Sequence, residues 1–241
     1  MAATLFLSDL HLEDRRPEAL PWLLAFLTGP ARKAAAVYIL GDLFEYWIGD
    51  DAPPQAAVEL AERTAALDAA GVACHFVHGN RDFLLGQAYA DRARLRLLPE
   101  TCVVNLYGRP TLILHGDTLC TDDVEYQAFR RQSRDPSWQA SVLALPVEQR
   151  LRMAREARDA SRAHTGAAAM EIMDVNPGAV REAFAAHGVR HMIHGHTHRP
   201  AVHRHDLGGG AEGERIVLAD WYDHGSYLEV TPAGARSIDL S

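Results

Sequence analysis

The sequence predicts an α/β protein in which two β-sheets are stacked between outer helices. Short apolar runs, bounded by Gly or Pro, alternate with helical stretches in the first half of the chain. A second group of short strands fills the C-terminal part. Several apolar runs end directly in Asp, Asn or His, where open α/β sheets place their binding sites. The same pattern therefore predicts both the fold and the place of a site.

The composition is typical of a globular domain. The 241 residues are 48% hydrophobic and 23% charged, enough for a sizeable core. We expect one domain over residues 1–241 that carries an insertion, rather than two domains. The formal net charge of -8 argues against a general nucleic-acid binder, so we expect no nucleic-acid partner. The sequence carries no signal for an oligomeric state.

The cysteines and the apolar runs indicate the redox environment of the protein and its relation to membranes. Cys74, Cys102 and Cys120 lack C-x-x-C spacing, so we expect free thiols in a reducing compartment. The N-terminal stretch lacks a basic region followed by an apolar core, and a signal peptide is not expected. No apolar run is long enough to span a bilayer, so any membrane contact is expected to be peripheral.

The first half is predicted to alternate strands and helices. Residues 3–8 form the first strand, and residues 17–26 form a helix with a leucine-rich face. Val37 to Leu40 is a short apolar run that ends at Gly41, as expected for a buried parallel strand. The next predicted elements are a helix over 56–70, a strand over 72–77, and a hairpin with strands over 103–106 and 111–114.

Residues 121–186 interrupt this alternation and are predicted to be helical almost throughout. Residues 124–162 contain eight Arg and five acidic residues, so this piece carries about +3 and the remainder about -11. One interpretation is an amphipathic helical pair packed on the core with its arginines solvated. The other is a helical cap over the site, residues 122–170, that presents cationic and apolar surface to an amphiphile or a membrane. Pattern alone does not separate the two.

The C-terminal part returns to strands. Residues 202–207 and 215–218 are predicted strands joined by a glycine-rich loop, and residues 226–230 and the last residues complete a β-rich end. Strands in both halves with helices outside them give the stacked arrangement. No internal repeat or low-complexity segment is present.

Five polar clusters follow the apolar runs, and together they resemble a metal site. In an extended segment, residues two apart face the same side, so Asp9 pairs with His11 and His196 pairs with His198. Asp42 can lend one oxygen to each of two cations, the arrangement used in phosphate-ester chemistry. The seven candidate ligands are Asp9, His11, Asp42, Asn80, His115, His196 and His198. All offer O or N, which suits Mn²⁺, Fe²⁺ or Zn²⁺.

The order D-x-H, G-D, G-N, a lone His, and G-H-x-H is similar to that of the calcineurin-like metallophosphoesterases. This resemblance implies an αββα sandwich. It also implies one metal at Asp9, His11, Asp42 and His198, and a second at Asp42, Asn80, His115 and His196. Mn²⁺ is the metal it favours, two ions per subunit, and the bound ions would lower the pKa of water and neutralise charge on phosphorus.

Arg81 departs from that pattern, because most of these enzymes carry His there. A His can protonate an alkoxide leaving group, whereas Arg stays protonated in proteins. Arg81 therefore favours a leaving group that is already charged, such as a phosphate monoester released from a pyrophosphate. We expect Arg81 and Asp42 to be the catalytic residues of a phosphoanhydride hydrolase. Asp82 and Asp117 are candidates for orienting a ligand histidine, although a structural use is equally expected.

Longer runs resemble the family of UDP-2,3-diacylglucosamine pyrophosphatases of lipid A biosynthesis. They surround all five clusters and include 115–123 and 172–176 in the insert. The resemblance implies hydrolysis of UDP-2,3-diacylglucosamine to UMP and 2,3-diacylglucosamine 1-phosphate, by water attack on the phosphorus next to uridine. It also implies a cytoplasmic protein, peripheral on the inner membrane. The implied substrate contacts are Asn80, Arg81, Asp123, Ser161, Thr165 and His196.

Two departures and two alternatives accompany this reading. Thr165 stands where relatives often have Asn, and Ala168 where they can have Lys, so a cationic contact is missing. One alternative is another metallophosphoesterase that acts on nucleotides or phosphodiesters, which Arg81 and the helical insert disfavour. The other is a non-catalytic scaffold of the same fold. Such a scaffold loses ligands, whereas all seven ligand positions are intact here.

Overall fold

A computed structural model describes residues 1–14, 17–167 and 174–240, without the side chains of residues 162–167. The first part of the chain forms β1 (Thr4–Leu7), α1 (Ala19–Thr28), η1 (Pro30–Lys33), β2 (Ala36–Leu40), α2 (Gln55–Ala69), β3 (Ala73–Val77), α3 (Gln87–Ala93), β4 (Leu95–Leu97), β5 (Thr101–Leu106) and β6 (Arg109–Leu114). The second part forms η2 (Asp117–Leu119), α4 (Val124–Ser133), α5 (Pro136–Leu143), α6 (Val147–Ala167), α7 (Pro177–His187), β7 (His191–His194), β8 (Ala201–Gly208), β9 (Ala211–Val217), β10 (Gly225–Thr231) and β11 (Gly234–Leu240).

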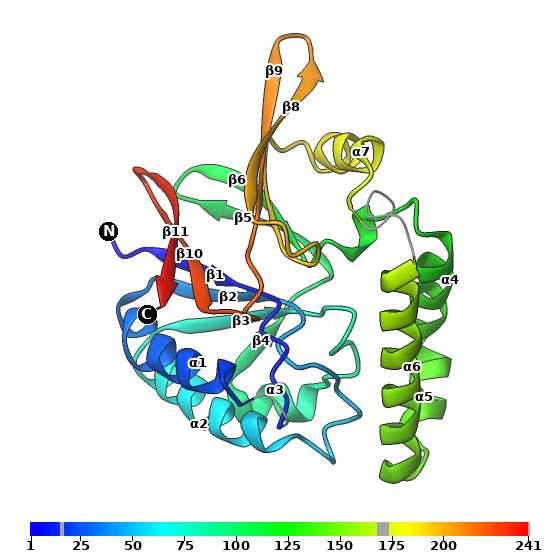
Figure 1. The fold of residues 1–241 in the computed structure, drawn as a ribbon. Helices are drawn as coiled ribbons and strands as arrows, with labels where there is room; N and C mark the ends of the chain where they lie inside the picture. Colours follow the sequence, from blue (N-terminus) through cyan, green and yellow to red (C-terminus); the bar gives the residue numbers. More distant parts are fainter. Residues whose placement is uncertain (15–16, 168–173, 241) are drawn as a thin grey trace.

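These strands form two sheets (Figure 1). The first has the order β11-β10-β1-β2-β3-β4, and β1 to β4 run parallel. The second has the order β5-β6-β7-β9-β8, with β6, β7 and β9 parallel. Helices α1, α2 and α3 lie against the first sheet, and α7 lies on the side of the second sheet. The predicted αββα sandwich is confirmed.

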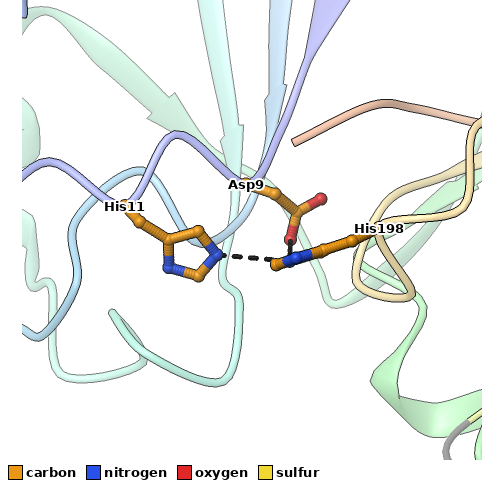
Figure 2. Close-up of side chains that lie close together, drawn as sticks. All are labelled: Asp9, His11 and His198. Carbon is orange, nitrogen blue, oxygen red and sulfur yellow. Dashed lines mark hydrogen bonds and ion pairs between the residues drawn. The ribbon is translucent and has the colours of Figure 1, made fainter. Parts of the chain in front are cut away.

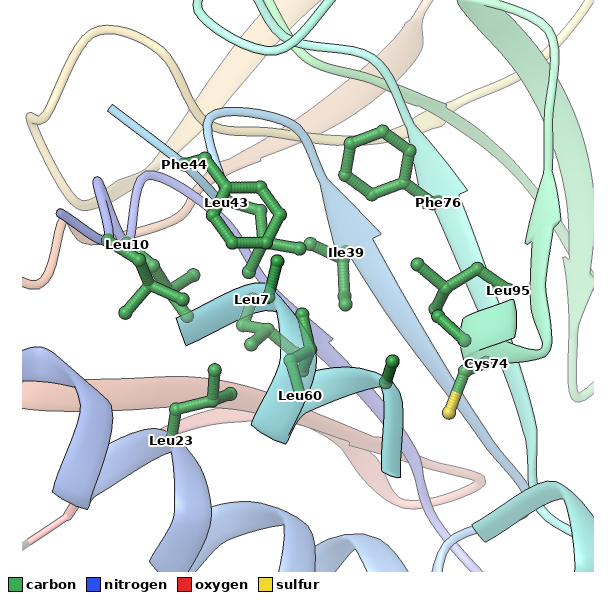
Figure 3. Close-up of a cluster of buried hydrophobic side chains, with 14 of the residues drawn as sticks. Leu7, Leu10, Leu23, Ile39, Leu43, Phe44, Leu60, Cys74, Phe76 and Leu95 are labelled. Carbon is green, nitrogen blue, oxygen red and sulfur yellow. The ribbon is translucent and has the colours of Figure 1, made fainter. Parts of the chain in front are cut away.

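Alternation along the strands divides the core into three clusters. In β1, Leu5 and Leu7 face α1 and α2, whereas Phe6 faces the second sheet. The helix-side cluster of the first sheet also contains Ile39 and Phe76 (Figure 3). In β6 and β7, Ile113 and Ile193 point between the sheets, while their neighbours pack under α7. Both sheets are therefore buried on two faces, which holds their strand ends in fixed positions.

Most strands were predicted within two residues of their observed ends, but β9 begins at Ala211, four residues before its predicted start at residue 215. Two short elements, α3 and β4, were not predicted, because a three-residue strand leaves almost no periodic signal. The predicted free thiols are confirmed: Cys74 and Cys120 are buried and Cys102 is partly buried. Among the described helices, none combines the length and apolar character needed to cross a membrane.

The insertion between β6 and β7 contains three helices, α4, α5 and α6, rather than a pair, and then α7. Helices α4 to α6 stand together at one side of the body (Figure 1). Trp138 and Met153 pack against the helix-side cluster of the first sheet. In contrast, Val124 is 70% exposed and Phe129 is 40% exposed. Some apolar side chains of the insertion thus pack on the body, and others are exposed.

Four arginines of the insertion are largely buried and pair with acids or carbonyls of the body. Arg130 Nε lies 2.8 Å from Asp117 Oδ2, and Arg134 Nη2 donates to the Gly79 carbonyl at 2.8 Å. Arg150 contacts Asp51 and the Ile48 carbonyl, and Arg158 forms an ion pair with Glu45. The expectation that the arginines are solvated is therefore wrong for these four, since they join a cationic insertion to an acidic body.

Arg150 provides an asymmetric test of this attachment. Its side chain is 3% exposed, whereas its partner Asp51 is 61% exposed. Arg150→Met removes the donors to the carbonyls of Ile48 and Leu145, so we expect the free energy of unfolding to fall by about 2 kcal/mol. Asp51→Asn removes only an exposed charge, and we expect a loss below about 1 kcal/mol. Urea unfolding of both variants measures this. Equal losses would show that the ion pair, not the carbonyl contacts, attaches the helices.

Candidate metal centre

The candidate ligands converge because their strands end at one edge of the two sheets. Asp9, Asp42 and Asn80 follow β1, β2 and β3, which are parallel neighbours. His115 and His196 follow β6 and β7 of the second sheet, which are also parallel neighbours. Backbone hydrogen bonds hold the loops together: Asp9 N donates to the Gly41 carbonyl, and Gly195 N donates to the His115 carbonyl. The sandwich therefore brings all seven predicted ligand positions to one place.

One group of ligands contains Asp9, His11 and His198 (Figure 2). His198 Nε2 lies 3.3 Å from both Asp9 Oδ1 and His11 Nε2. The second oxygen of Asp9 accepts hydrogen bonds from Ser8 Oγ at 2.6 Å and from His196 N at 2.9 Å. These bonds fix the carboxylate so that Oδ1 faces the two imidazoles.

The other group contains Asn80, His115 and His196. Asn80 Oδ1 lies 2.9 Å from His115 Nε2 and 3.0 Å from His196 Nδ1, and the two nitrogens are 3.2 Å apart. His115 Nδ1 contacts the Leu40 carbonyl at 2.8 Å, which favours the tautomer with its lone pair on Nε2. Three atoms with lone pairs thus face one another.

Asp42 stands between the two groups. Its Oδ2 lies 4.0 Å from His11 Nε2, and its Oδ1 lies 3.7 Å from His115 Nε2. Oδ1 also accepts a hydrogen bond from Arg81 N at 2.9 Å, and the side chain is 3% exposed. Each oxygen therefore faces a different group.

The backbone is strained at this edge. Five candidate ligands have positive φ angles: Asp9 at 56°, His11 at 50°, Asp42 at 50°, His196 at 69° and His198 at 53°. Left-handed conformations are unfavourable for residues with a Cβ, and in proteins they concentrate at functional sites. Only Arg94 and Tyr107 share this feature among the other non-glycine residues that the structure describes. The strain is independent of the sequence motif and marks the same residues.

Two glycines allow the loops to approach one another. A Cβ on Gly79 would overlap the Asp42 carboxylate and amide, and one on Gly195 would overlap Asp9 Oδ2 and Ser8 Oγ. Neither position has room for a side chain. The Gly that precedes Asn80 and the Gly that precedes His196 are therefore required for the carboxylates to reach their places.

The buried carboxylates create a strongly negative site. Burial opposes ionisation of Asp9, but His198, His115 and His11 outweigh it and hold the pKa of Asp9 well below its usual range. Burial lowers the pKa values of His11 and His196 to about 4. Burial also disfavours a charge on His115, yet Asp42 and Asp9 outweigh it and raise its pKa to about 9. The carboxylates therefore favour a positive charge among the ligands.

The donor set fits divalent metal ions. Metal–N and metal–O bonds of about 2.0–2.2 Å place neighbouring ligand atoms about 3.0–3.5 Å apart. The separations within both groups, 2.9–3.3 Å, agree with this spacing. The donors are carboxylate, amide and imidazole without thiolate, and the buried negative charge calls for cations. The residues present thus form a candidate centre for two divalent ions.

Arg81 borders this centre. Its backbone is fixed by hydrogen bonds to Asp42 and from Trp47 N, and its Nη2 donates to Ser161 Oγ of α6 at 3.3 Å. Arg81 Nε is a buried donor with no acceptor within the described part of the chain. A guanidinium with an unused donor next to a cluster of carboxylates and imidazoles can bind an anion.

The other predicted contacts have mixed outcomes. Ser161 reaches the site through Arg81, whereas Asp123 accepts a hydrogen bond from Tyr126 N and caps α4. The side chain of Thr165 and all of Ala168 lie outside the described residues. Asp82 accepts from the amides of Leu43 and Gly79, and Asp117 accepts from Tyr126 and Arg130, so the contacts seen among the described residues are those of a structural use.

Several residues beside the centre were not found from the sequence. Glu45 Oε2 lies 3.0 Å from His11 Nδ1, and Asp220 Oδ2 lies 3.8 Å from His198 Nδ1. The ring of Tyr222 stacks on that of His11 with centroids 5.3 Å apart. Glu45 stands in the run Gly41–Glu45, but Asp220 and Tyr222 follow no motif. Their roles depend on how β9 and β10 return to the site.

Two stacked sheets with seven O and N donors where their strands end are typical of metal-dependent phosphoesterases. The profile of the calcineurin-like phosphoesterase family matches residues 3–200. The chain belongs to this family.

Several bacterial proteins are similar to this chain over nearly its whole length. A Stenotrophomonas maltophilia protein is 52% identical over 98% of this chain and 97% of its own length. Proteins of Xanthomonas campestris and of an Enterobacter species are each 49% identical, and each alignment covers 99% of both chains. All three relatives are named UDP-2,3-diacylglucosamine hydrolase.

The close approach at Gly79 yields a test of the centre. We expect Gly79→Ala to displace Asp42 and to lower both divalent-metal content and turnover, the latter by about 100-fold or more, because misplacement by about 1 Å has that effect. Gly71→Ala is the control for crowding, since an added Cβ there has no neighbour within 4 Å, although the positive φ of Gly71 makes that substitution strained in its own right. Metal analysis of both proteins decides. Normal metal content in Gly79→Ala would contradict the crowding argument.

Proposed function

We propose that this protein hydrolyses the pyrophosphate bond of UDP-2,3-diacylglucosamine, giving UMP and 2,3-diacylglucosamine 1-phosphate. The proposal rests on the family, on relatives of about 50% identity along the whole chain, and on the candidate centre. The observation that carries it is Arg81, whose unused buried donor adjoins that centre. An Arg there stabilises a charged phosphate leaving group without transferring a proton.

The seven ligands have distinct places in this proposal. Asp9, His11 and His198 would hold one ion, Asn80, His115 and His196 would hold the other, and Asp42 would be available to both. Bound ions would supply Lewis acidity and lower the pKa of water. We propose Mn²⁺ as the metal. Arg81, Asn80 and His196 would contact the phosphates, because they line the same edge on the side of α6.

The helical insertion, residues 122–170, would receive the acyl chains, with Asp123, Ser161 and Thr165 as its polar contacts. Supporting this, Val124, Phe129, Leu143 and Val147 of α4 to α6 are 40–70% exposed. Each CH₂ left in water costs about 0.8 kcal/mol, so a diacyl substrate needs apolar surface to receive it. A lipid substrate and these exposed side chains support a peripheral location on the cytoplasmic face of the inner membrane.

Product analysis tests the function. The purified protein is incubated with UDP-2,3-diacylglucosamine and Mn²⁺ in ¹⁸O-water, and products are identified by mass spectrometry. We expect UMP carrying the label and unlabelled 2,3-diacylglucosamine 1-phosphate. Asp42→Ala should abolish the reaction, because both groups lose a shared ligand. Label in the sugar phosphate would mean attack on the other phosphorus, and an intact substrate would refute the function.

The role of Arg81 makes a separate prediction. We expect Arg81→Ala to lower kcat on the lipid substrate by about 100- to 1000-fold, the usual effect of removing one preorganised contact. Arg81→His should not create activity on the monoester p-nitrophenyl phosphate. The control is Arg155→Ala, an exposed arginine of α6. Unchanged kcat in Arg81→Ala would exclude stabilisation of the leaving group by this residue.

A further inference from the structure

Glu45 is a buried acid in the loop after β2. Only 3% of the surface of Glu45 is exposed to solvent. The backbone fixes its position: Glu45 N donates to the Leu12 carbonyl, and Leu12 N donates to that of Leu43, so the segments after β1 and β2 continue side by side. The side chain is thereby held next to His11 by main-chain contacts and not only by its own.

Within the described residues, two side chains approach this carboxylate. His11 Nδ1 lies 3.0 Å from Glu45 Oε2, and Arg158 of α6 forms an ion pair with Glu45 Oε1. Glu13 lies farther from Arg158, at 3.9 Å, and is itself partly exposed. A buried carboxylate stays ionised only with such partners. Removing one partner leaves the negative charge less well compensated and strengthens its dependence on the other partner. The two contacts of Glu45 are therefore energetically connected.

The contact with His11 has a chemical consequence. A carboxylate at Nδ1 favours the neutral tautomer with its proton on Nδ1, which leaves the lone pair of Nε2 directed toward His198 and Asp42. The other ligands have weaker orienting groups: a neutral carbonyl for His115 and Asp220 at 3.8 Å for His198. Among these three ligands, and within the residues that the structure describes, His11 has the closest carboxylate on its outer nitrogen.

We propose that Glu45 is a positioning residue for His11, and that its ion pair with Arg158 links the seating of α6 on the body to metal binding at His11. The inference rests on the metal centre of the proposed function. Glu45 holds both His11 and Arg158, so a cation bound at His11 would polarise the imidazole and strengthen its interaction with Glu45. Linkage is reciprocal, so a seated α6 favours the ion as much as the ion favours the seated helix.

The first experiment separates positioning from a purely structural ion pair. Metal-stripped protein is titrated with Mn²⁺ by calorimetry. We expect Glu45→Gln to weaken one of two sites by about 10- to 100-fold, as loss of an orienting carboxylate does, and to leave the other unchanged. Glu13→Gln, which removes the other acid near Arg158, should leave both sites unchanged. Two wild-type affinities in Glu45→Gln, or equal weakening of both sites, would overturn the proposal.

The second experiment approaches the link from the helix. Hydrogen–deuterium exchange of residues 151–161 is measured with and without Mn²⁺. We expect the ion to slow exchange by several-fold in the wild type, and Arg158→Met to abolish this effect while Mn²⁺ still binds. Arg155→Met, an exposed arginine of the same helix, should behave as wild type. Protection that persists in Arg158→Met, or is absent from the wild type, would refute the link. Failure of the wild type to bind Mn²⁺ would instead refute the metal centre itself.

Discussion

The burial of Asp9 and Asp42 between the ends of two sheets is the constraint on which the rest of the structure depends. Two carboxylates in an apolar surrounding are costly unless positive charge and hydrogen-bond donors reach them. The Ser8 hydroxyl and the His196 backbone amide donate hydrogen bonds to Asp9, and the Arg81 backbone amide donates one to Asp42. The fold also supplies four imidazoles, and the carboxylates of Asp42 and Asp9 raise the pKa of one of them, that of His115, to about 9. Left-handed backbone at five ligands is the conformational cost of this convergence.

The same electrostatic argument explains the charge of the insertion. A body of about -11 attracts a helical piece of about +3, and the attraction is realised at particular pairs rather than as a diffuse field. Arg130 and Arg134 secure α4, Arg150 secures the start of α6, and Arg158 secures its middle. Arg134 donates to the carbonyl of Gly79, in the loop that carries Asn80. Arg158 pairs with Glu45, in the loop that carries Asp42. The helices are therefore attached to two of the loops that carry the candidate ligands.

The ligands could be predicted from the sequence because each directly follows a strand, and the end of a strand determines its place in the sheet. Arg81 was predictable as a departure from a pattern, yet its contact with Ser161 was not, because that contact depends on how α6 lies. Glu45 and Arg158 were missed for the same reason. For Asp117 the sequence left an orienting and a structural use open, and the structure shows the hydroxyl of Tyr126 and Nε of Arg130 donating to its carboxylate.

The place of the insertion has a consequence for how such a protein can diversify. Strands β6 and β7 pair directly, from Thr111 with His191 to Ile113 with Ile193, so the ladder between them does not depend on the intervening helices. The chain leaves the second sheet just after one ligand and returns to it just before the next. The length and sequence of the helices can therefore change in evolution while the register that places His115 beside His196 stays the same.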